Sequence, residues 1–233
     1  KKQVQSSHTL SKQSGIALNN LRKFQECKLS GNQLFDASKL GKFLAICRIW
    51  NAEHALLLHN INFYLNPITC LLEPIGFDAM PGVNKQSTWC YFTEGRLPVN
   101  WVNQALKSPE IAESYIKNLS AFSSEAYLAN LQESFKSSEL HYRRLLLNNL
   151  VMSSDSDIWS SNYSLLNYDV WNMLKERFSL IRNELAEKKP ILAYSNLSPK
   201  NPLSINLHIR NALTQPVEII SFHRGDKQWN PKK

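Results

Sequence analysis

The spacing of hydrophobic residues changes once along the chain. Between residues 36 and 185 apolar side chains recur mainly every three or four positions, which is the spacing of one face of an α-helix. After residue 203 they alternate with polar residues, which is typical of strands that are buried on one side. The pattern predicts an α+β protein, in which a mainly helical body carries a β-hairpin and is followed by the first strands of a β-domain.

Four helices are predicted in the body, and each has one apolar face. Asp36 is the expected N-cap of the first helix, and Ser108-Pro109-Glu110 has the cap, proline and acid that begin the second. The third begins near Ser123 or Ser124, and the last begins near Tyr168. The expected buried faces, in chain order, are Leu40, Phe43, Leu44, Cys47 and Trp50; Ile111, Tyr115 and Leu119; Leu128, Leu131 and Phe135; and Val170, Leu174, Phe178, Ile181 and Leu185.

A β-hairpin is predicted between the first and second helices. Residues 62–66 are rich in aromatic side chains and favour a strand, and residues 71–77 return as its partner after a turn at Pro67. Residues 78–98 contain scattered glycine and proline and are expected to form a long loop. Near the end of the chain, two strands are expected around residues 205–209 and 217–219, joined by a short turn.

These patterns divide the chain into three parts. Residues 1–33 are polar and weakly periodic and are expected to be a peripheral segment, residues 34–190 form the helical body, and residues 203–233 begin a β-rich domain. Two strands by themselves are only marginally stable in water. Because the chain also lacks an initial methionine, we expect it to be a piece of a longer protein.

Composition narrows the range of partners. The formal net charge is +8, but the basic residues are scattered and no basic run is interleaved with stacking aromatic residues, so a nucleic-acid partner is not expected. No run reaches the roughly 18 apolar residues of a membrane span. The four cysteines form no C-x-x-C pair, which argues against a zinc site, and Cys47 is expected to be a buried thiol.

The hairpin carries the most informative polar residues of the chain. Asn60 precedes the first strand and Asp78 follows the second, so pairing of the strands would bring the two side chains toward one point. Amide and carboxylate oxygens are suitable ligands for Mg²⁺, which keeps part of its shell for water and phosphate. The pair is therefore a candidate site for Mg²⁺ and a nucleotide. Alternatively, Asn60 caps a turn and Asp78 merely begins the loop.

The stretch FLAICRIWNAEHALLLHNINFYLNPITCLLEPIGFDA resembles the CotH family of atypical protein kinases, named after a spore-coat protein. His59-Asn60, Asn62-Phe63-Tyr64-Leu65 and Phe77-Asp78 lie where that family's pattern requires them. The likeness extends over roughly residues 35–190, where the helices resemble a kinase C-lobe. It implies that residues 1–33 are the tail of an upstream N-lobe.

The resemblance implies phosphoryl transfer from ATP to protein hydroxyls. Asp78 would bind Mg²⁺ in the manner of the D-F-G aspartate, and Asn60 would act as the catalytic-loop asparagine. The expected cofactors are therefore Mg²⁺ and ATP, with Asn60 and Asp78 as both metal-binding and cofactor-binding residues. Ala55 occupies the position of the catalytic-loop aspartate, which leaves the neighbouring Glu53 and His54 as the catalytic residues we predict.

Two features of the sequence keep a second interpretation open. Ala55 cannot accept a proton, and the chain contains neither a G-x-G-x-x-G loop nor a strand of the V-A-I-K type. The alternative to an enzyme is a catalytically inactive, kinase-like scaffold or binding protein in a bacterial cell-surface or coat assembly. The retained Asn60 and Asp78 favour the enzyme.

Overall fold

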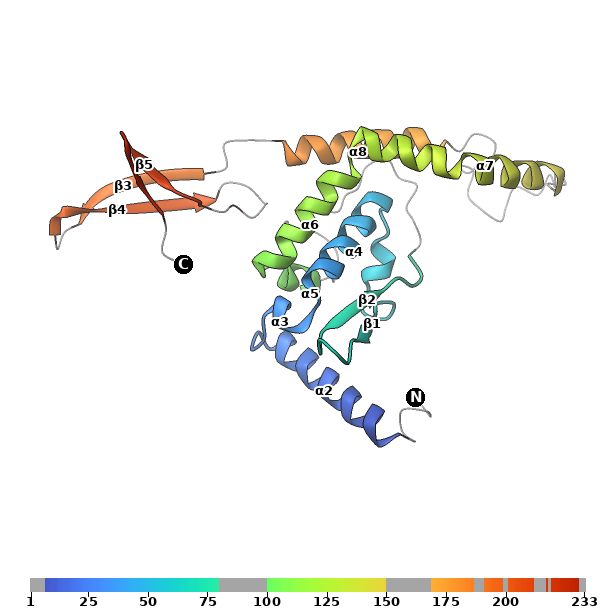
Figure 1. Cartoon of the computed structure of the whole chain (residues 1–233), viewed down its shortest axis with the longest axis horizontal. Helices are drawn as coiled ribbons and strands as arrows, with labels where there is room; N and C mark the ends of the chain where they lie inside the picture. The colour runs from blue at the N-terminus through green and yellow to red at the C-terminus, as the bar shows by residue number, and fades with distance from the viewer. Residues whose placement is uncertain are drawn as a thin grey trace. The chain divides into compact units, whose positions relative to one another are not determined.

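The computed structural model describes residues 7–79, 100–149, 169–186, 191–198, 201–211, 217 and 219–230. It divides the chain into two compact units (Figure 1), one formed by residues 1–90 and 96–185 and the other by residues 91–95 and 186–233. The described residues are mainly helical and carry small antiparallel sheets, which confirms the α+β class predicted from the sequence.

The first unit is helical apart from one hairpin. Its elements are α2 (His8–Gln25), α3 (Gly31–Leu34), α4 (Ala37–Trp50), the 3-10 helix η1 (Glu53–Leu56), β1 (Asn62–Leu65), β2 (Leu72–Ile75), α5 (Asn100–Ala105), α6 (Pro109–Phe122), α7 (Glu125–Asn149) and α8 (Val170–Leu185). The predicted caps Asp36 and Ser108 precede α4 and α6, and the side chain of Asp36 accepts a hydrogen bond from the Lys39 amide at 2.9 Å.

The α4–α6 pair forms the centre of this unit, and a glycine allows the two helices to approach closely. A methyl group on Gly41 would lie 2.5 Å from the Ser114 Cβ atom and 2.6 Å from the Tyr115 backbone nitrogen, which is too close for either contact. The Ser114 hydroxyl donates to the Ser38 carbonyl across the same contact at 3.1 Å. The predicted α6 face is correct, because Ile111, Tyr115 and Leu119 are buried.

The predicted face of α4 is correct at its centre and wrong at its edges. Leu40, Leu44 and Cys47 are buried, whereas Phe43 and Trp50 are only half-buried. The buried surface is wider than one stripe because α6, α8 and β2 all contact this helix. It therefore includes residues that the pattern did not select: Ala45, Arg48 and Ile49. Burial raises the pKa of the Cys47 thiol to about 12.

Helix α8 buries its predicted face together with a guanidinium group. Leu174, Phe178 and Ile181 are buried, and Leu185 is half-buried. Arg177 is also buried, and its Nη1 donates to the Ile49 carbonyl at 2.9 Å. This contact joins α8 to the last turn of α4.

The predicted face of α7 is wrong in its second half. Leu128 is buried and Leu131 is half-buried, but Phe135 is 54% exposed. Helix α7 has 25 residues, and Figure 1 shows its second half extending beyond the other described helices of the unit. The apolar spacing along α7 predicts a helix correctly, but it does not show what covers each turn.

The N-terminal segment contains one long helix. Residues 1–33 are predicted to be a polar, weakly periodic and peripheral segment, and within them α2 extends over 18 residues from the N-cap Ser7. Only its end is anchored, because Phe24 is buried against Phe35 with ring centroids 5.2 Å apart. Leu10 and Leu18 remain exposed, so α2 lacks the continuous buried stripe that sequence periodicity detects.

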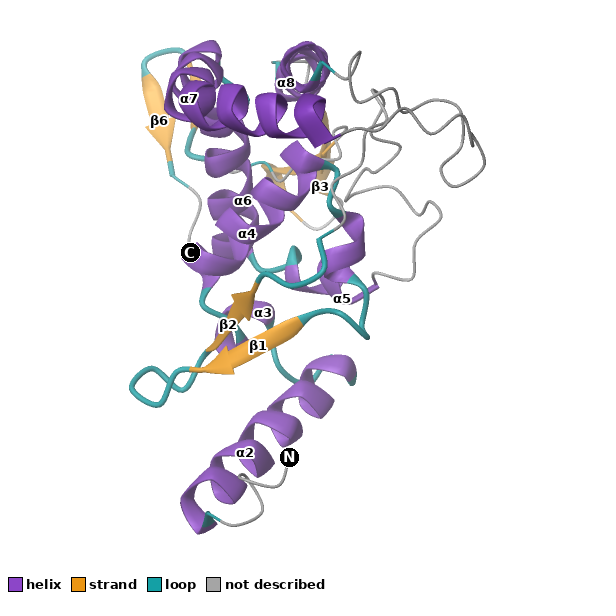
Figure 2. Cartoon of the chain, turned by 90° about the vertical axis from the view of Figure 1, so that its right-hand side faces the viewer, coloured by secondary structure: helices purple, strands orange, loops and turns teal. Residues whose placement is uncertain are grey.

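The predicted hairpin is confirmed. Strands β1 and β2 pair antiparallel, with Asn62 opposite Ile75 and Leu65 opposite Leu72. Leu72 is buried and its carbonyl accepts a hydrogen bond from the Asp36 amide at 3.0 Å, which joins β2 to the start of α4. Figure 2 shows the hairpin between α2 and the α4–α6 pair.

The second unit consists of two hairpins in the described residues. Strand β3 (Ile191–Ser198) pairs with β4 (Asn201–Asn211), and β5 (Phe222–Arg224) pairs with β6 (Lys227–Trp229). The strand predicted at residues 205–209 is confirmed as part of β4. Its predicted partner is wrong, because β4 pairs with the preceding segment, whereas Val217 and Ile219 lie outside the strands. The long loop predicted at 78–98 lies outside the described residues from position 80 onward.

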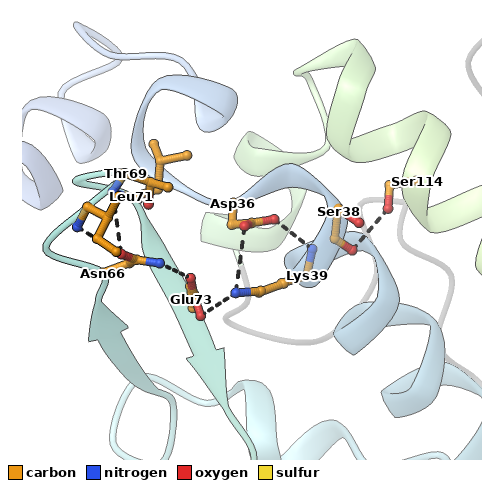
Figure 3. A network of polar contacts seen from close by, with 9 residues as sticks. Asp36, Ser38, Lys39, Asn66, Thr69, Leu71, Glu73 and Ser114 are labelled. Carbon is orange, nitrogen blue, oxygen red and sulfur yellow. Dashed lines mark hydrogen bonds and ion pairs between the residues drawn. The ribbon is translucent and has the colours of Figure 1, made fainter.

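A polar cluster fastens the hairpin to α4 (Figure 3). The Lys39 ammonium lies 2.6 Å from Glu73 Oε2 and 4.0 Å from Asp36 Oδ2, and the Asn66 side-chain amide donates to Glu73 Oε1 at 2.8 Å. The hydrogen bonds from Lys39 and Asn66 lower the pKa of Glu73, and the hydrogen bond to Glu73 raises the pKa of Lys39. The cluster is therefore charged on both sides at neutral pH.

Truncation of Phe178 tests the helical core. Phe178 is fully buried, so Phe178→Ala should lower the free energy of unfolding by about 3–5 kcal/mol through lost burial and a residual cavity. Phe135→Ala is the matched control, because that side chain is more than half exposed. Urea denaturation monitored by circular dichroism measures both. Equal, small losses for the two variants would show that α8 does not pack as described.

The polar cluster around Glu73 and Lys39 predicts that the stability of the fold depends on pH. A carboxyl whose folded-state pKa is lowered stabilises the fold above its unfolded pKa, and that contribution is lost as pH falls through the folded value. Glu73→Gln should therefore lower the denaturation midpoint at pH 7 and approach wild type at acid pH. Glu133→Gln removes an exposed pair with Lys136 and should change little at either pH. A Glu73→Gln deficit that does not diminish in acid would contradict this assignment.

Candidate functional site

Asn60 is fixed in position by the turn that follows η1. Its backbone amide donates to the Leu57 carbonyl at 2.8 Å, and its side chain is buried, with 6% of the residue exposed. The side-chain nitrogen Nδ2 donates to the His54 carbonyl at 3.0 Å and lies 2.5 Å from His54 Nδ1. The Asn60 side chain is therefore held by both the backbone and the ring of one residue.

Asp78 lies just beyond β2 and contacts the same ring. Its backbone oxygen is 3.2 Å from His54 Nδ1, and its carboxylate Oδ2 is 3.5 Å from that nitrogen. The Asp78 φ angle of 44° lies in the left-handed region, which is uncommon for a residue other than glycine. The carboxylate is 45% exposed, so it is open to a ligand from solvent.

The hairpin register explains why these residues meet. Asn62 is opposite Ile75 at the open end of the hairpin, and continuing the register places residue 60 opposite residue 77. Asn60 and Asp78 therefore lie on the two chains that leave the hairpin side by side. The predicted convergence of the two side chains occurs, and His54 lies between them.

Glu53 occupies a different environment from His54. It begins η1 and is half-buried, and no hydrogen bond or ion pair joins it to Asn60 or Asp78 in the part of the chain described. Burial raises the pKa of its carboxyl group, and the positive charge of Arg48 opposes that shift. A raised pKa suits a group that exchanges protons near neutral pH. The structure thus brings together three of the four predicted site residues.

The balance of donors and acceptors at the site fits a cation. The hydrogen bonds of Asn60 use its side-chain nitrogen, and among the described residues no donor reaches its Oδ1. The Asp78 carboxylate and carbonyl add further acceptor atoms beside His54 Nδ1. Asn60 Oδ1 and the exposed Asp78 carboxylate are oxygen atoms of the kind that a hard cation such as Mg²⁺ takes as ligands. Asn60 Oδ1 and the Asp78 carboxylate are the two protein ligands that would hold it.

The described residues contain no group of three or more histidine, cysteine, aspartate or glutamate side chains arranged for a metal ion. A two-ligand site does not need such a group. Mg²⁺ is commonly bound through one or two carboxylates and completes its octahedral shell with water and substrate phosphates. The donor set of Asn60 and Asp78 matches that mode of binding and does not match a zinc or calcium cage.

Sequence reasoning missed the support beneath the site. The Trp101 indole nitrogen on α5 donates to the Leu56 carbonyl at 2.9 Å, which joins α5 to the end of η1. The Trp101 ring also packs edge-on against Phe63 of β1, with centroids 5.8 Å apart. Residue 101 is far from the hairpin in sequence, and no local pattern connects the two. The contacts of His54 with both Asn60 and Asp78 could not be predicted from the sequence either, because they depend on the tight turn of η1.

In the described part of the chain, no helix is both long and apolar enough to cross a membrane. Comparisons of the chain with protein-family models, curated proteins and solved structures found no match.

Proposed function

We propose that this chain is a CotH-like kinase domain portion that uses Mg²⁺ and ATP to transfer phosphate to protein hydroxyls. One observation carries the proposal: Asn60 and Asp78 are separated by a complete hairpin, yet both contact His54 Nδ1. The same two residues were selected from the sequence as ligands for Mg²⁺. Asn60 also keeps Oδ1 without a donor among the described residues, and the Asp78 carboxylate is 45% exposed, so both oxygens can serve as ligands.

Each residue has a distinct role in this proposal. Asp78 is exposed and negatively charged, so its carboxylate would offset most of the positive charge of the ion. Asn60 is buried and neutral, so it would contribute an oriented oxygen with little mobility. When bound, Mg²⁺ neutralises charge that develops on the transferred phosphate. The hairpin keeps its two ligands at a fixed separation, so that ATP completes the coordination.

The proton acceptor in this proposal comes from η1. Ala55, which lies five residues before Asn60, cannot accept a proton. Glu53 and His54, which are adjacent to it, are the two candidates for this role. Burial raises the pKa of the Glu53 carboxyl above its usual value and that group makes no hydrogen bond or ion pair with Asn60 or Asp78 among the described residues, whereas His54 Nδ1 is already engaged with both. Glu53 is therefore the stronger candidate for accepting the hydroxyl proton.

One observation favours an alternative, in which the chain is an inactive kinase-like scaffold of a bacterial cell-surface or coat assembly. Ala55 is buried, with 2% of the residue exposed, so its methyl group is part of the core. With a buried apolar residue at the position of the family's proton acceptor, the chain would still bind a nucleotide but would lack the group that accepts the hydroxyl proton during phosphoryl transfer. The two proposals agree on Mg²⁺ and ATP binding and differ only in turnover.

Replacement of Asp78 tests the shared part of both proposals. Asp78→Ala should abolish Mg²⁺-dependent ATP binding, because the metal loses its only charged protein ligand among the described residues, and Asn60→Ala should weaken it less. Isothermal titration calorimetry with ATP, in the presence and absence of MgCl₂, measures the effect. Asp226→Ala changes an exposed aspartate in the β5–β6 turn and is the matched control.

Unchanged Mg²⁺-ATP affinity in Asp78→Ala, with wild-type binding present, would overturn the proposed site. If affinity falls as expected but wild-type protein never transfers phosphate to a protein hydroxyl, the scaffold alternative holds. The fold should persist in Asp78→Ala, since Asp78 is exposed and lies outside the core.

A further inference from the structure

The His54 carbonyl determines which way the Asn60 amide points. A carbonyl oxygen can only accept a hydrogen bond, so the Asn60 atom that lies 3.0 Å from it must be the nitrogen. The opposite orientation would place two oxygen atoms at that distance without a proton between them. The Asn60 side chain therefore directs Oδ1 away from the His54 carbonyl, and this conclusion does not depend on how the imidazole is protonated.

The orientation of Asn60 in turn selects the tautomer of His54. The second hydrogen of the Asn60 amide points toward His54 Nδ1, which lies 2.5 Å from the amide nitrogen. Nδ1 must then accept a hydrogen bond, which in a neutral imidazole requires the proton to be on Nε2. In this tautomer the lone pair of Nδ1 is also close to the Asp78 carbonyl and carboxylate oxygens.

This arrangement leaves an unbalanced cluster of acceptors. Both hydrogens of the Asn60 amide are used, so nothing in the trio of His54, Asn60 and Asp78 donates to the Asp78 carboxylate. In the opposite tautomer, a hydrogen on Nδ1 could be donated to Asp78. That hydrogen would then point toward a hydrogen of the Asn60 amide, and the two donors would repel each other. The Asp78 carboxylate, which is 45% exposed, is therefore left to interact with water or with a cation.

We propose that His54 is a positioning residue, which as the Nε2–H tautomer holds the Asn60 amide nitrogen so that Asn60 Oδ1 faces the cation. The inference rests on the proposed function, because it assigns His54 a role in the Mg²⁺ site. It also separates His54 from proton transfer. The ring orients a metal ligand, and the proton acceptor is left to Glu53. Outer residues that orient ligands typically contribute 10- to 100-fold to metal affinity.

The first test reads the tautomer directly. A long-range ¹H–¹⁵N correlation spectrum of the ¹⁵N-labelled chain, at one mildly alkaline pH and without metal, distinguishes a protonated ring nitrogen from an unprotonated one. The proposal expects an unprotonated Nδ1 and a protonated Nε2 for His54, assigned by comparison with His54→Asn. A protonated Nδ1 in this spectrum overturns the proposal. A purely space-filling role for His54 would not select one tautomer.

The second test measures Mg²⁺ affinity by calorimetry in the presence of ATP. His54→Ala should weaken Mg²⁺ binding by about 10- to 100-fold. His54→Asn should recover most of that loss, because its Oδ1 is as many bonds from the backbone as Nδ1 and can only accept. His141→Ala is the matched control, since that histidine is exposed on α7.

The outcomes separate the inference from the function on which it rests. Wild-type binding with unchanged affinity in His54→Ala overturns the positioning role and leaves the Mg²⁺ site intact. Loss of affinity in both His54→Ala and His54→Asn, with both folded by circular dichroism, also overturns it, because the acceptor would then not be the relevant feature. Absence of Mg²⁺ binding by the wild type overturns the proposed function, and the nitrogen spectrum still decides whether His54 orients Asn60.

Discussion

The antiparallel pairing of β1 with β2 is the constraint on which the site depends. Four residue pairs fix the register, and a shift of one residue would turn every side chain of a strand to the opposite face. An isolated two-stranded hairpin is marginal in water, so this one needs support from outside. The Asp36–Leu72 backbone hydrogen bond and the Lys39–Glu73 ion pair supply it from α4, and Trp101 supplies it from α5.

The contacts from α4 act near the turn of the hairpin, whereas Trp101 contacts β1 nearer its open end, where the polar chemistry occurs. The polar cluster around Glu73 and Lys39 fixes β2 near the turn of the hairpin. His54, Asn60 and Asp78 meet at the other end, where the backbone enters β1 and leaves β2. The α4–α6 pair is closely packed at Gly41, which has no side chain, and η1 follows α4 after Asn51 and Ala52. The hairpin and η1 together hold Asn60 and Asp78 in contact with one nitrogen of His54. Such preorganisation is what a weakly liganded Mg²⁺ site needs from its scaffold.

The sequence predicts correctly those features that depend on residues close together in the chain. The caps at Asp36 and Ser108, the hairpin with its turn at Pro67, and the convergence of Asn60 with Asp78 all follow from short-range patterns. The exposed Phe135 was missed because the spacing of apolar residues does not reveal which turns are covered. The β3–β4 pairing was missed because partner choice is a tertiary property. His54 was selected for its chemistry, but its contacts required the geometry of η1.

The central claim is that one cation is shared by Asn60 and Asp78. A crystal structure of the chain grown with MnCl₂ and a non-hydrolysable ATP analogue tests it most directly, because Mn²⁺ substitutes for Mg²⁺ and its anomalous scattering locates the ion. The account predicts an anomalous peak about 2 Å from both Asn60 Oδ1 and an Asp78 carboxylate oxygen, with analogue phosphate oxygens completing the shell. An ion bound to the analogue but remote from Asp78, or Asn60 presenting its nitrogen toward the peak, would contradict the account.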